Sequence, residues 1–327
     1  MLFAGIASIL SFKYSLLNDI VKKLKQTLKV RSLSAGHIFI IKDKNGTSET
    51  LRNETIKNTE IENVKFISVH VPTHLKPLND EQFGHYLAGL IDGDGHFSSK
   101  QELVIVFSSL DVNLAYYIKE RLGFGNVKKV KNKNAHLLII SKKEGIKKII
   151  NLINGKIRTE NKFNQITNNI LNHDRYTDLR NKIKFKLNLD NNFKNHWIAG
   201  FSDADASFQI KVLNRTNRVE VRINFQIDQK KDYILLLIKD FFGGNIGYRK
   251  SQDTYYYGST SFGSARNVIN YFDYYHLLSS KHINYLKWRK TYIIIQNKNH
   301  LTEEGIKKII KLKNTMNSLN NTTNSLR

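Results

Sequence analysis

Hydrophobic and polar residues along this chain follow one order that occurs twice. The first copy predicts a strand at Leu103–Phe107, a helix at Val112–Leu122, a hairpin of Asn126–Val130 and His136–Ser141, and a helix at Glu144–Ile153. The second copy predicts strands at Ser207–Leu213 and Glu220–Ile227, a helix at Tyr233–Phe242, strands at Ile246–Arg249 and Tyr255–Thr260, and a helix at Ser264–Tyr275. With one helix ahead of each copy, the pattern predicts an α+β protein of two pseudo-symmetric αββαββα domains.

A nine-residue motif begins each copy, LAGLIDGDG at Leu87–Gly95 and IAGFSDADA at Ile198–Ala206. In both motifs a pair of small residues precedes a third small residue by about one helical turn; these are Ala88, Gly89 and Gly93 in the first, and Ala199, Gly200 and Ala204 in the second. Small residues at this spacing form a flat stripe through which two helix backbones approach closely. The motifs therefore predict two helices packed against each other.

An aspartate ends each motif helix, where a negative charge is unfavourable. The first helix is predicted to begin at Asn79 or Asp80, after Pro77, and to end near Asp94. A helix C-terminus is already electronegative, so a carboxylate there costs about 0.3–1 kcal/mol unless a positive charge offsets it. If the two helices pack together, Asp94 and Asp205 gather with unpaired carbonyl oxygens at one point, and Mg²⁺ prefers such oxygen ligands.

Other polar residues of the motifs are interpreted structurally. Asp92 and Asp203 also recur, but they lie within the helix ends, so we interpret them as capping or solvated groups. His85 and His96 flank the first motif. Because neither recurs as histidine in the second copy, both are interpreted as structural.

On these paired motifs the chain resembles the LAGLIDADG homing endonucleases, in their single-chain, two-motif, intron-encoded form, over roughly Pro77–Asn317. The resemblance implies that the two motif helices form the interface between the domains, and that each domain presents a saddle-shaped antiparallel sheet to DNA. It also implies that Asp94 and Asp205 bind the catalytic metal, Mg²⁺ with Mn²⁺ as a substitute. The backbone carbonyl groups of Gly93 and Ala204 would contribute to the same ions.

The family also places a polar, water-organising residue and a basic residue in each half. Gln229, just after the Phe225 strand, fits the first role in the second domain, and Asp111 occupies roughly the equivalent place in the first. The basic candidates are Lys162 and Lys281, which open the related stretches KFNQI and KHINY. A helix-capping or solvated position is the alternative for both lysines.

The chain is strongly basic, with 52 Lys and Arg against 28 Asp and Glu and a net charge of +24. The positive charge is spread over both halves, which favours a nucleic acid over a membrane surface as the partner. AT-rich coding, which enriches Lys and Asn, is an alternative source of this charge. The chain has no cysteine, which excludes disulfides, thiolate zinc sites and a cysteine nucleophile.

Alternation in the second copy predicts one sheet face on the helices and one face open to solvent. The open face carries long polar residues, which are Gln209, Lys211, Arg218, Glu220, Arg222, Asn224 and Gln226. Arg and Lys suit guanine edges, Gln and Asn suit adenine, and a two-stranded ribbon fits the major groove. We interpret this face as a base-reading surface; an ordinary solvated sheet face is the alternative.

The two copies differ in their first hairpin, which predicts an asymmetric DNA site. The interval from Phe97 to Phe107 is shorter than the interval from Phe208 to Phe225. Basic residues gather instead on the second hairpins, as Lys128, Lys129, Lys131 and Lys133 in the first copy and Arg249 and Lys250 in the second. These side chains are predicted to hold phosphates and not to read bases.

The chain is expected to divide into an N-terminal extension (1–76), a first domain (77–173), a linker (174–195), a second domain (196–318) and a polar tail (319–327). Met1–Phe12 is apolar but too short to span a bilayer, and Lys13–Arg31 is basic with apolar residues at helical spacing. The extension is interpreted either as a targeting sequence or as read-through from an upstream exon, with a polar linker at Asp43–Asn63. No stable membrane association is expected for the mature domains.

Three classes of function remain open. A metal-dependent, site-specific double-strand endonuclease, cutting across the minor groove of a long asymmetric target, needs both Asp94 and Asp205. An RNA maturase that assists splicing of its host group I intron needs the basic surface but not the acids, and a DNA-binding regulator would be expected to have lost one acid. The presence of both acids favours a DNA endonuclease, and two pseudo-symmetric domains in one chain favour action as a monomer. The Lys, Asn and Ile bias favours a mitochondrial, organelle-encoded origin.

Overall fold

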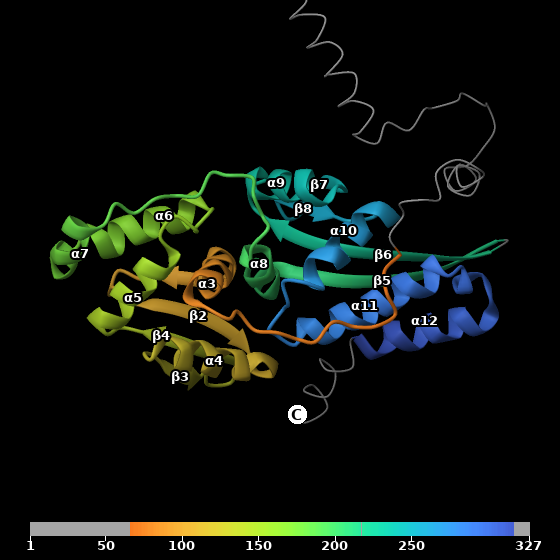
Figure 1. The fold of residues 1–327 in the computed structure, drawn as a ribbon, viewed down its shortest axis with the longest axis horizontal. Coiled ribbons are helices and arrows are strands. Elements are labelled where there is room, and N and C mark those ends of the chain that lie inside the picture. Colours follow the sequence, from red (N-terminus) through yellow and green to blue (C-terminus); the bar gives the residue numbers. More distant parts are fainter. Residues whose placement is uncertain (1–65, 217, 317–327) are drawn as a thin grey trace, which may run out of the picture. The chain divides into compact units, whose positions relative to one another are not determined.

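The computed structural model describes residues 66–216 and 218–316 of the chain (Figure 1). The predicted apolar and basic N-terminal stretches, the polar linker at Asp43–Asn63 and the C-terminal tail lie outside these residues. Within the described ranges, no helix combines the length and the apolar character that crossing a membrane requires.

The first half has the predicted order of elements. Its helices are α3 (Asp80–Asp94), α4 (Val112–Leu122) and α5 (Lys143–Ile153), and its strands are β1 (Gly95–Phe97), β2 (Leu103–Ser108), β3 (Asn126–Lys129) and β4 (Ala135–Ile140). The short helix α6 (Glu160–Ile166) continues into a π-helical turn at Thr167–Leu171. A 3₁₀ turn at Asp174–Tyr176 and the helix α7 (Thr177–Lys182) then lead into the stretch that joins the halves.

The second half repeats this order with longer strands. It consists of α8 (Trp197–Asp205), β5 (Ala206–Arg215), β6 (Arg218–Gln229), α9 (Tyr233–Phe242), β7 (Asn245–Arg249), β8 (Thr254–Gly258), α10 (Phe262–Phe272), α11 (Lys281–Gln296) and α12 (Glu303–Met316). Helix α12 follows a 3₁₀ turn at Asn299–Leu301. This order confirms the predicted two-copy α+β fold.

Local chemistry fixes the ends of several helices. The side chain of Asn79 accepts a hydrogen bond from the backbone N–H of Gln82 at 2.9 Å, so it caps α3 where the sequence predicted the start. Helix α4 ends at Gly123, whose φ of 75° is left-handed and therefore suits glycine. Gly125 and Gly244, with φ of 114° and 104°, supply the two turns that precede β3 and β7.

Each half contains one four-stranded antiparallel sheet, with the strand orders β1-β2-β4-β3 and β5-β6-β8-β7. One face of the second sheet is buried, because the Phe208 ring lies 5.5 Å from the ring of Tyr285 and 5.6 Å from that of Trp288 in α11. The alternate residues of β5, including Gln209 and Lys211, lie on the other face, as predicted. The helices therefore cover one face and leave the other open.

The first hairpins of the two sheets differ in length. Strand β1 has 3 residues and β5 has 10. Phe97 pairs with Leu103, whereas Phe208 pairs with Phe225, so the register makes Leu103 and not Phe107 the counterpart of Phe225. The prediction that the first hairpin is shorter in the first copy is confirmed. The difference in hairpin length is larger than the spacing of the phenylalanines indicated.

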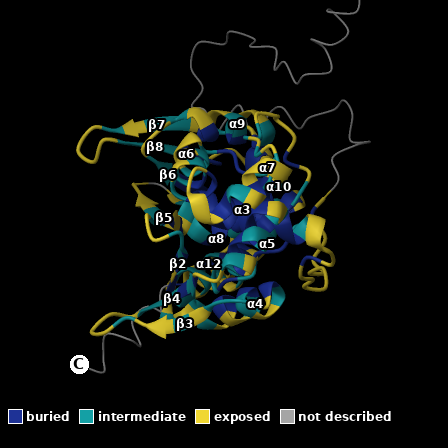
Figure 2. Cartoon of the chain, turned by 90° about the vertical axis from the view of Figure 1, so that its left-hand side faces the viewer, coloured by how far each residue is buried: buried dark blue, intermediate teal, exposed yellow. Residues whose placement is uncertain are grey.

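Helices α3 and α8 pack along their small residues. A Cβ atom at Gly89 would lie 2.0 Å from the carbonyl oxygen of Trp197, and one at Gly200 would lie 1.9 Å from that of Tyr86. Any larger residue would collide with backbone, so glycine is required at both positions. The two helices lie side by side at the centre of the described residues in both views (Figures 1 and 2), as the motifs predicted.

Residues ahead of α3 are attached to the second half. The backbone N–H and C=O groups of Ile67 bond to the side-chain amide of Gln296, at 2.9 and 3.1 Å. Arg289 donates to the carbonyl of His70 at 3.2 Å, and a ring nitrogen of His74 lies 2.8 Å from the carbonyl of Leu277. This segment therefore connects the halves in addition to the α3–α8 seam.

Candidate active site at the helix seam

Asp94 and Asp205 are the last residues of α3 and α8, and the close packing of the helices brings them together. A Cβ atom at Gly93 would lie 2.3 Å from the Cβ of Ala204 and 3.1 Å from Oδ2 of Asp205. The end of one motif helix therefore lies beside the carboxylate of the other, with no room for a side chain at Gly93. The structure gathers the two acids at one point, as the sequence predicted.

The two carboxylates lie in an environment that disfavours their charge. Asp94 is exposed at the surface and Asp205 is half-buried. Neighbouring protein groups nevertheless displace enough water to raise the pKa of Asp94 to about 6, and the charge of Asp205 adds to this effect. Desolvation also raises the pKa of Asp205, while the hydrogen bond from Gln229 and the charges of Lys281 and Lys162 lower it. A bound cation would relieve both carboxylates.

The residues at the seam fit a divalent metal ion of the Mg²⁺ type. Among the residues that the structure describes, no cluster of three or more His, Cys, Asp or Glu side chains could hold a metal by itself. Mg²⁺ commonly binds through one or two carboxylates, with water and substrate phosphates as its other ligands, so Asp94 and Asp205 suffice. The carbonyl oxygen of Ala204, a predicted further ligand, accepts a hydrogen bond from Lys281 Nζ at 2.6 Å.

Both predicted lysines reach the seam. Lys281 Nζ donates to the carbonyl oxygens of Ser202 and Ala204, at 3.1 and 2.6 Å. Lys162 Nζ donates to the carbonyl of Gly95. Burial lowers the pKa of both ammonium groups, and the nearby aspartates oppose that change. Each lysine thus places a positive charge at the electronegative end of the motif helix of its own half.

The inner aspartates of the motifs are buried. Asp92 accepts hydrogen bonds from the N–H of Arg158 at 2.8 Å, from the N–H and Oγ1 of Thr159 at 3.1 and 2.6 Å, and from Trp197 Nε1 at 2.9 Å. Asp203 accepts from the N–H groups of Leu278 and Ser279 at 2.7 and 3.3 Å, from Ser279 Oγ, and from the Tyr86 hydroxyl at 2.6 Å. The interpretation of Asp92 and Asp203 as solvated groups is therefore wrong. Both instead accept hydrogen bonds from backbone N–H groups of the segment ahead of the lysine in their own half.

Gln229 lies at the seam, but Asp111 is not its counterpart. Gln229 Nε2 donates to Oδ2 of Asp205 at 2.7 Å. The sheet registers pair Ala206 with Ile227 and Gly95 with Ile105, so the residue two positions further along β2 is the buried Phe107. Asp111 instead ends a 3₁₀ turn at Ser109–Asp111, and its Oδ1 accepts a hydrogen bond from the N–H of Ser280 at 2.6 Å. The sequence misplaces it because Asp111 follows Phe107 at the same interval as Gln229 follows Phe225, whereas the register makes Leu103 the counterpart of Phe225.

The open face of the second sheet carries most of the predicted base-reading residues. Lys211 pairs with Arg222 across β5 and β6, and Gln209 pairs with Asn224. Arg218 is exposed near the end of the same hairpin. Gln226 differs from the prediction, because it is only 9% exposed and its Nε2 donates to the carboxylate of Asp228. Its place next to the buried end of the strand removes it from the solvent.

The second hairpins present the basic residues. Lys128 and Lys129 are exposed on β3, and Lys131 and Lys133 are exposed in the turn that follows. Lys250 is exposed beyond β7, whereas Arg249 is half-buried and forms an ion pair with Asp228 at 2.9 Å. In Figure 2 the β3–β4 and β7–β8 hairpins project to the same side of the described part as β5. This arrangement gives the open sheet faces a basic margin.

Two residues near the site, His96 and Asp228, are not indicated as site residues by the sequence pattern. His96 is exposed on β1 between the buried Gly95 and Phe97, so it lies on the open face, two residues after Asp94. The alternation of the strand could have placed it, but its lack of recurrence led to the structural interpretation. Asp228 lies close enough to Asp205 to raise the pKa of that carboxyl group. Only the register of β6 reveals this proximity.

Known proteins share both the sequence and the fold. The family model for the LAGLIDADG endonuclease matches residues 87–173 and 198–292. A Schizosaccharomyces pombe relative, "Uncharacterized cox1 intron-2 37.2 kDa protein", is 62% identical over 306 residues, which cover 92% of this chain and 90% of that protein. The Saccharomyces cerevisiae "Intron-encoded DNA endonuclease aI3" is 31% identical, over 67% of this chain and 65% of its own length.

A further relative and a solved structure extend this likeness. The Saccharomyces cerevisiae "Intron-encoded RNA maturase bI4" is 27% identical over 68% of this chain, which spans only 35% of that protein. The structure of the "I-LtrWI LAGLIDADG homing endonuclease bound to target DNA" has a TM-score of 0.58 at 23% identity and covers 73% of this chain and 99% of the solved chain. The match to both motif-bearing halves shows that the chain belongs to the LAGLIDADG endonuclease family.

Proposed function

We propose that this protein is a site-specific, metal-dependent endonuclease that cuts both strands of DNA across the minor groove of a long asymmetric target. The observation that carries the proposal is the meeting of Asp94 and Asp205 at the ends of the two motif helices, where their charges disfavour each other. Membership of the family and the DNA-bound state of the related solved structure support it. Mg²⁺, with Mn²⁺ as a substitute, is the proposed cofactor.

In this proposal the seam residues hold the reacting groups. A bound Mg²⁺ would activate water and neutralise charge on the phosphate and the departing 3′ oxygen. Asp94 and Asp205 would hold the ion, together with the carbonyl groups of Gly93 and Ala204. Gln229, which already bonds to Asp205, would orient water in one half, and Lys162 and Lys281 would offset the developing negative charge.

The open sheet faces would bind the target. Gln209, Lys211, Arg218, Arg222 and Asn224 would read base edges in the major groove. Lys128, Lys129, Lys131 and Lys250 would hold phosphates, and Arg249 would join them if it exchanges Asp228 for a phosphate. Gln226 would act within the hydrogen-bond network at the end of β6. Because β5 extends further than β1, the second half would contact a longer stretch of DNA.

Replacing either seam acid tests the proposal. Asp94→Asn and Asp205→Asn should each reduce double-strand cutting of a target that spans the intronless insertion site by at least about 10³-fold, because one metal ligand and one charge are lost. Specific DNA affinity should remain within a few-fold. Asp178→Asn, which changes a carboxylate outside the seam, serves as the control and should cut normally. Undiminished Mg²⁺-dependent cutting by the seam variants would refute the assignment.

The assembly, domain limits and origin are part of the same proposal. Two half-sites within one chain support action as a monomer. We retain domain limits at 77–173 and 196–318, joined by 174–195, with 1–76 as an extension and 319–327 as a tail. A mitochondrial, organelle-encoded origin is supported by the Lys, Asn and Ile bias and by a relative named after a cox1 intron.

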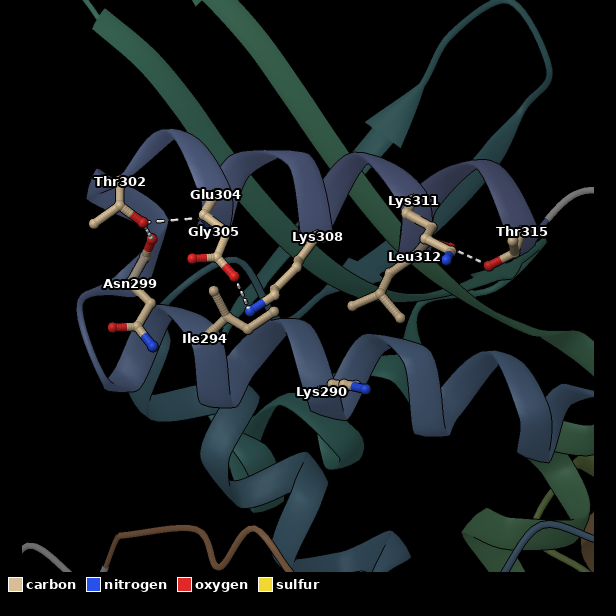
Figure 3. A pocket seen from close by; sticks show the side chains of 10 residues that line it. All are labelled: Lys290, Ile294, Asn299, Thr302, Glu304, Gly305, Lys308, Lys311, Leu312 and Thr315. Carbon is tan, nitrogen blue, oxygen red and sulfur yellow. Dashed lines mark hydrogen bonds and ion pairs between the residues drawn. The ribbon is translucent and has the colours of Figure 1, made fainter.

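A second candidate function is binding of the host intron RNA, as a maturase does. Helices α11 and α12 enclose a groove of about 710 Å³ that includes Lys290, Lys308 and Lys311 (Figure 3). Lys308 pairs with Glu304 at 2.6 Å, whereas Lys290 and Lys311 have no ion-pair partner within the described residues. Because α11 packs on the covered face of the second sheet, this basic groove is separate from the open face proposed for DNA.

Separate substitutions distinguish RNA binding from DNA cutting. Lys290→Ala combined with Lys311→Ala should weaken binding of the host intron transcript by about tenfold, because two phosphate contacts are lost, while DNA cutting stays unchanged. Lys142→Ala combined with Lys184→Ala removes the same charge at exposed positions elsewhere and is the control. Equal RNA binding by both double variants would exclude this groove as the RNA site.

A further inference from the structure

Each buried carboxylate of the motifs accepts a hydrogen bond from the opposite half. Tyr86 of α3 donates its hydroxyl to Oδ2 of Asp203 in α8, at 2.6 Å. Trp197 of α8 donates Nε1 to Oδ2 of Asp92 in α3, at 2.9 Å. Asp92 and Asp203 are only 5% and 7% exposed, and both donors are fully buried. The contact is therefore reciprocal across the seam, although the two donors differ in residue type.

The same carboxylates hold the segment that leads to each lysine. Asp203 binds the N–H groups of Leu278 and Ser279 and the hydroxyl of Ser279. Ser279 Oγ in turn accepts from the backbone N–H of Lys281 at 3.1 Å, and Lys281 Nζ reaches back to the carbonyl of Ala204. One continuous path of hydrogen bonds thus runs from Tyr86 in the first half to the lysine of the second half.

The first half contains the equivalent path. Asp92 binds the N–H of Arg158 and both the N–H and the hydroxyl of Thr159. Thr159 is the residue before α6, and its carbonyl accepts from the N–H of Phe163 in the first turn of that helix. Lys162 lies in the same turn and donates to the carbonyl of Gly95. Trp197 of the second half therefore begins a path that ends at the lysine of the first half.

We propose that Asp92 and Asp203 are positioning residues through which each half of the seam holds the lysine of the other half. The physical reason is that a buried carboxylate turns to satisfy all its donors, so loss of one donor lets it shift and loosens the backbone it binds. The tight backbone contact at Gly89 and Gly200 keeps the aromatic donors in register. For catalysis the inference rests on the proposed endonuclease function, because it predicts that a change in one half slows the strand cut that the lysine of the other half serves.

Removing a single hydroxyl tests this coupling. Tyr86→Phe deletes the donor to Asp203 and keeps the ring that fills the seam. The rate of Lys281 acetylation, measured by mass spectrometry relative to that of Lys162, should rise by about two- to tenfold, the factor that corresponds to one lost hydrogen bond. Trp197→Phe should shift the ratio in the opposite direction. The matched control is Tyr257→Phe, which removes a buried hydroxyl that donates to the carbonyl of Gly243 at 2.8 Å in the second half.

The outcomes separate the coupling from the proposed function. An unchanged ratio in Tyr86→Phe, or the same change in Tyr257→Phe, would overturn the inference. Strand-resolved cleavage provides the second measurement: Tyr86→Phe should slow one strand more than the other, and the affected strand should be the one that Lys281→Ala slows most. If wild-type protein cuts no DNA, the endonuclease proposal fails, while the acetylation ratio still decides whether the halves are coupled.

Discussion

The carboxylate of Asp94 lowers the stability of the folded chain at neutral pH. Its folded-state pKa of about 6 exceeds the ordinary value of 3.8, so the folded protein binds this proton more tightly than the unfolded chain does. The free energy of unfolding therefore falls as the pH rises from about 3.8 to about 6, and the full cost remains above that range. Desolvation raises the pKa of the neighbouring Asp205 as well. Two neighbouring carboxylates that both destabilise the fold are typical of a site that a bound cation stabilises.

Asp94→Asn should therefore stabilise the protein while abolishing cutting. At pH 7.5 we expect a Tm increase of about 2–4 °C, which corresponds to about 1 kcal/mol after allowance for solvent screening at an exposed group. Near pH 4 the difference should vanish, because the wild-type carboxyl group is then protonated. Calorimetry at both pH values, without divalent metal, measures this effect.

Asp178→Asn is the contrasting variant for this measurement. Lys147 and Lys143 lower the pKa of Asp178 to about 2, which is the opposite direction. Its replacement should leave the Tm unchanged or lower it at pH 7.5. A lower Tm for Asp94→Asn at pH 7.5 would contradict the argument from desolvation.

At the scale of elements, the α3–α8 seam depends on two glycines. Gly89→Ala and Gly200→Ala would each place a Cβ atom about 2 Å from a backbone carbonyl oxygen of the facing helix. Backbone cannot move away without separating the helices, so each change should lower the free energy of unfolding by about 3 kcal/mol or more. Denaturant titration followed by circular dichroism measures the loss.

Gly263→Ala is the matched control in another helix. A Cβ atom at Gly263, in the first turn of α10, would meet nothing within 4 Å. The free energy of unfolding of the Gly263→Ala variant should be unchanged or higher by up to about 1 kcal/mol, because alanine favours the helix more than glycine does. If all three substitutions had equal effects, close backbone packing would not explain the small residues of the motifs.

The elements were predictable where local chemistry decides them. The sequence placed α4 at Val112–Leu122 and α9 at Tyr233–Phe242, in agreement with the structure, because amphipathic spacing and a following glycine define both ends. The proximity of Asp94 and Asp205 could also be predicted, because two helices with the same stripe of small residues are expected to pack against each other. The place of Asp111 could not be predicted, because it depends on where β2 ends and on strand register.

Contacts between distant segments were the least predictable feature of the site. Tyr86 directly precedes the first motif and Trp197 directly precedes the second, and nothing in the local pattern shows that either donates to a carboxylate of the opposite helix. No local pattern distinguishes capping from solvation at Asp92 and Asp203, because their burial arises only when both halves are assembled. Lys162 and Lys281 were identified through the family resemblance and not through periodicity.

At the scale of the whole molecule, the net charge of +24 predicts DNA affinity that depends steeply on salt. Each phosphate contact releases counterions and contributes about −0.9 to the slope of log K against log salt, so about six contacts predict a slope near −5. Replacing Lys128, Lys129 and Lys131 with Gln should make this slope shallower by about 3, whereas Gln209→Ala should change sequence preference and leave the slope intact. Fluorescence anisotropy between about 50 and 200 mM salt measures both effects. A flat profile for the wild-type protein would mean that the basic hairpins of the two sheets do not bind a phosphate backbone.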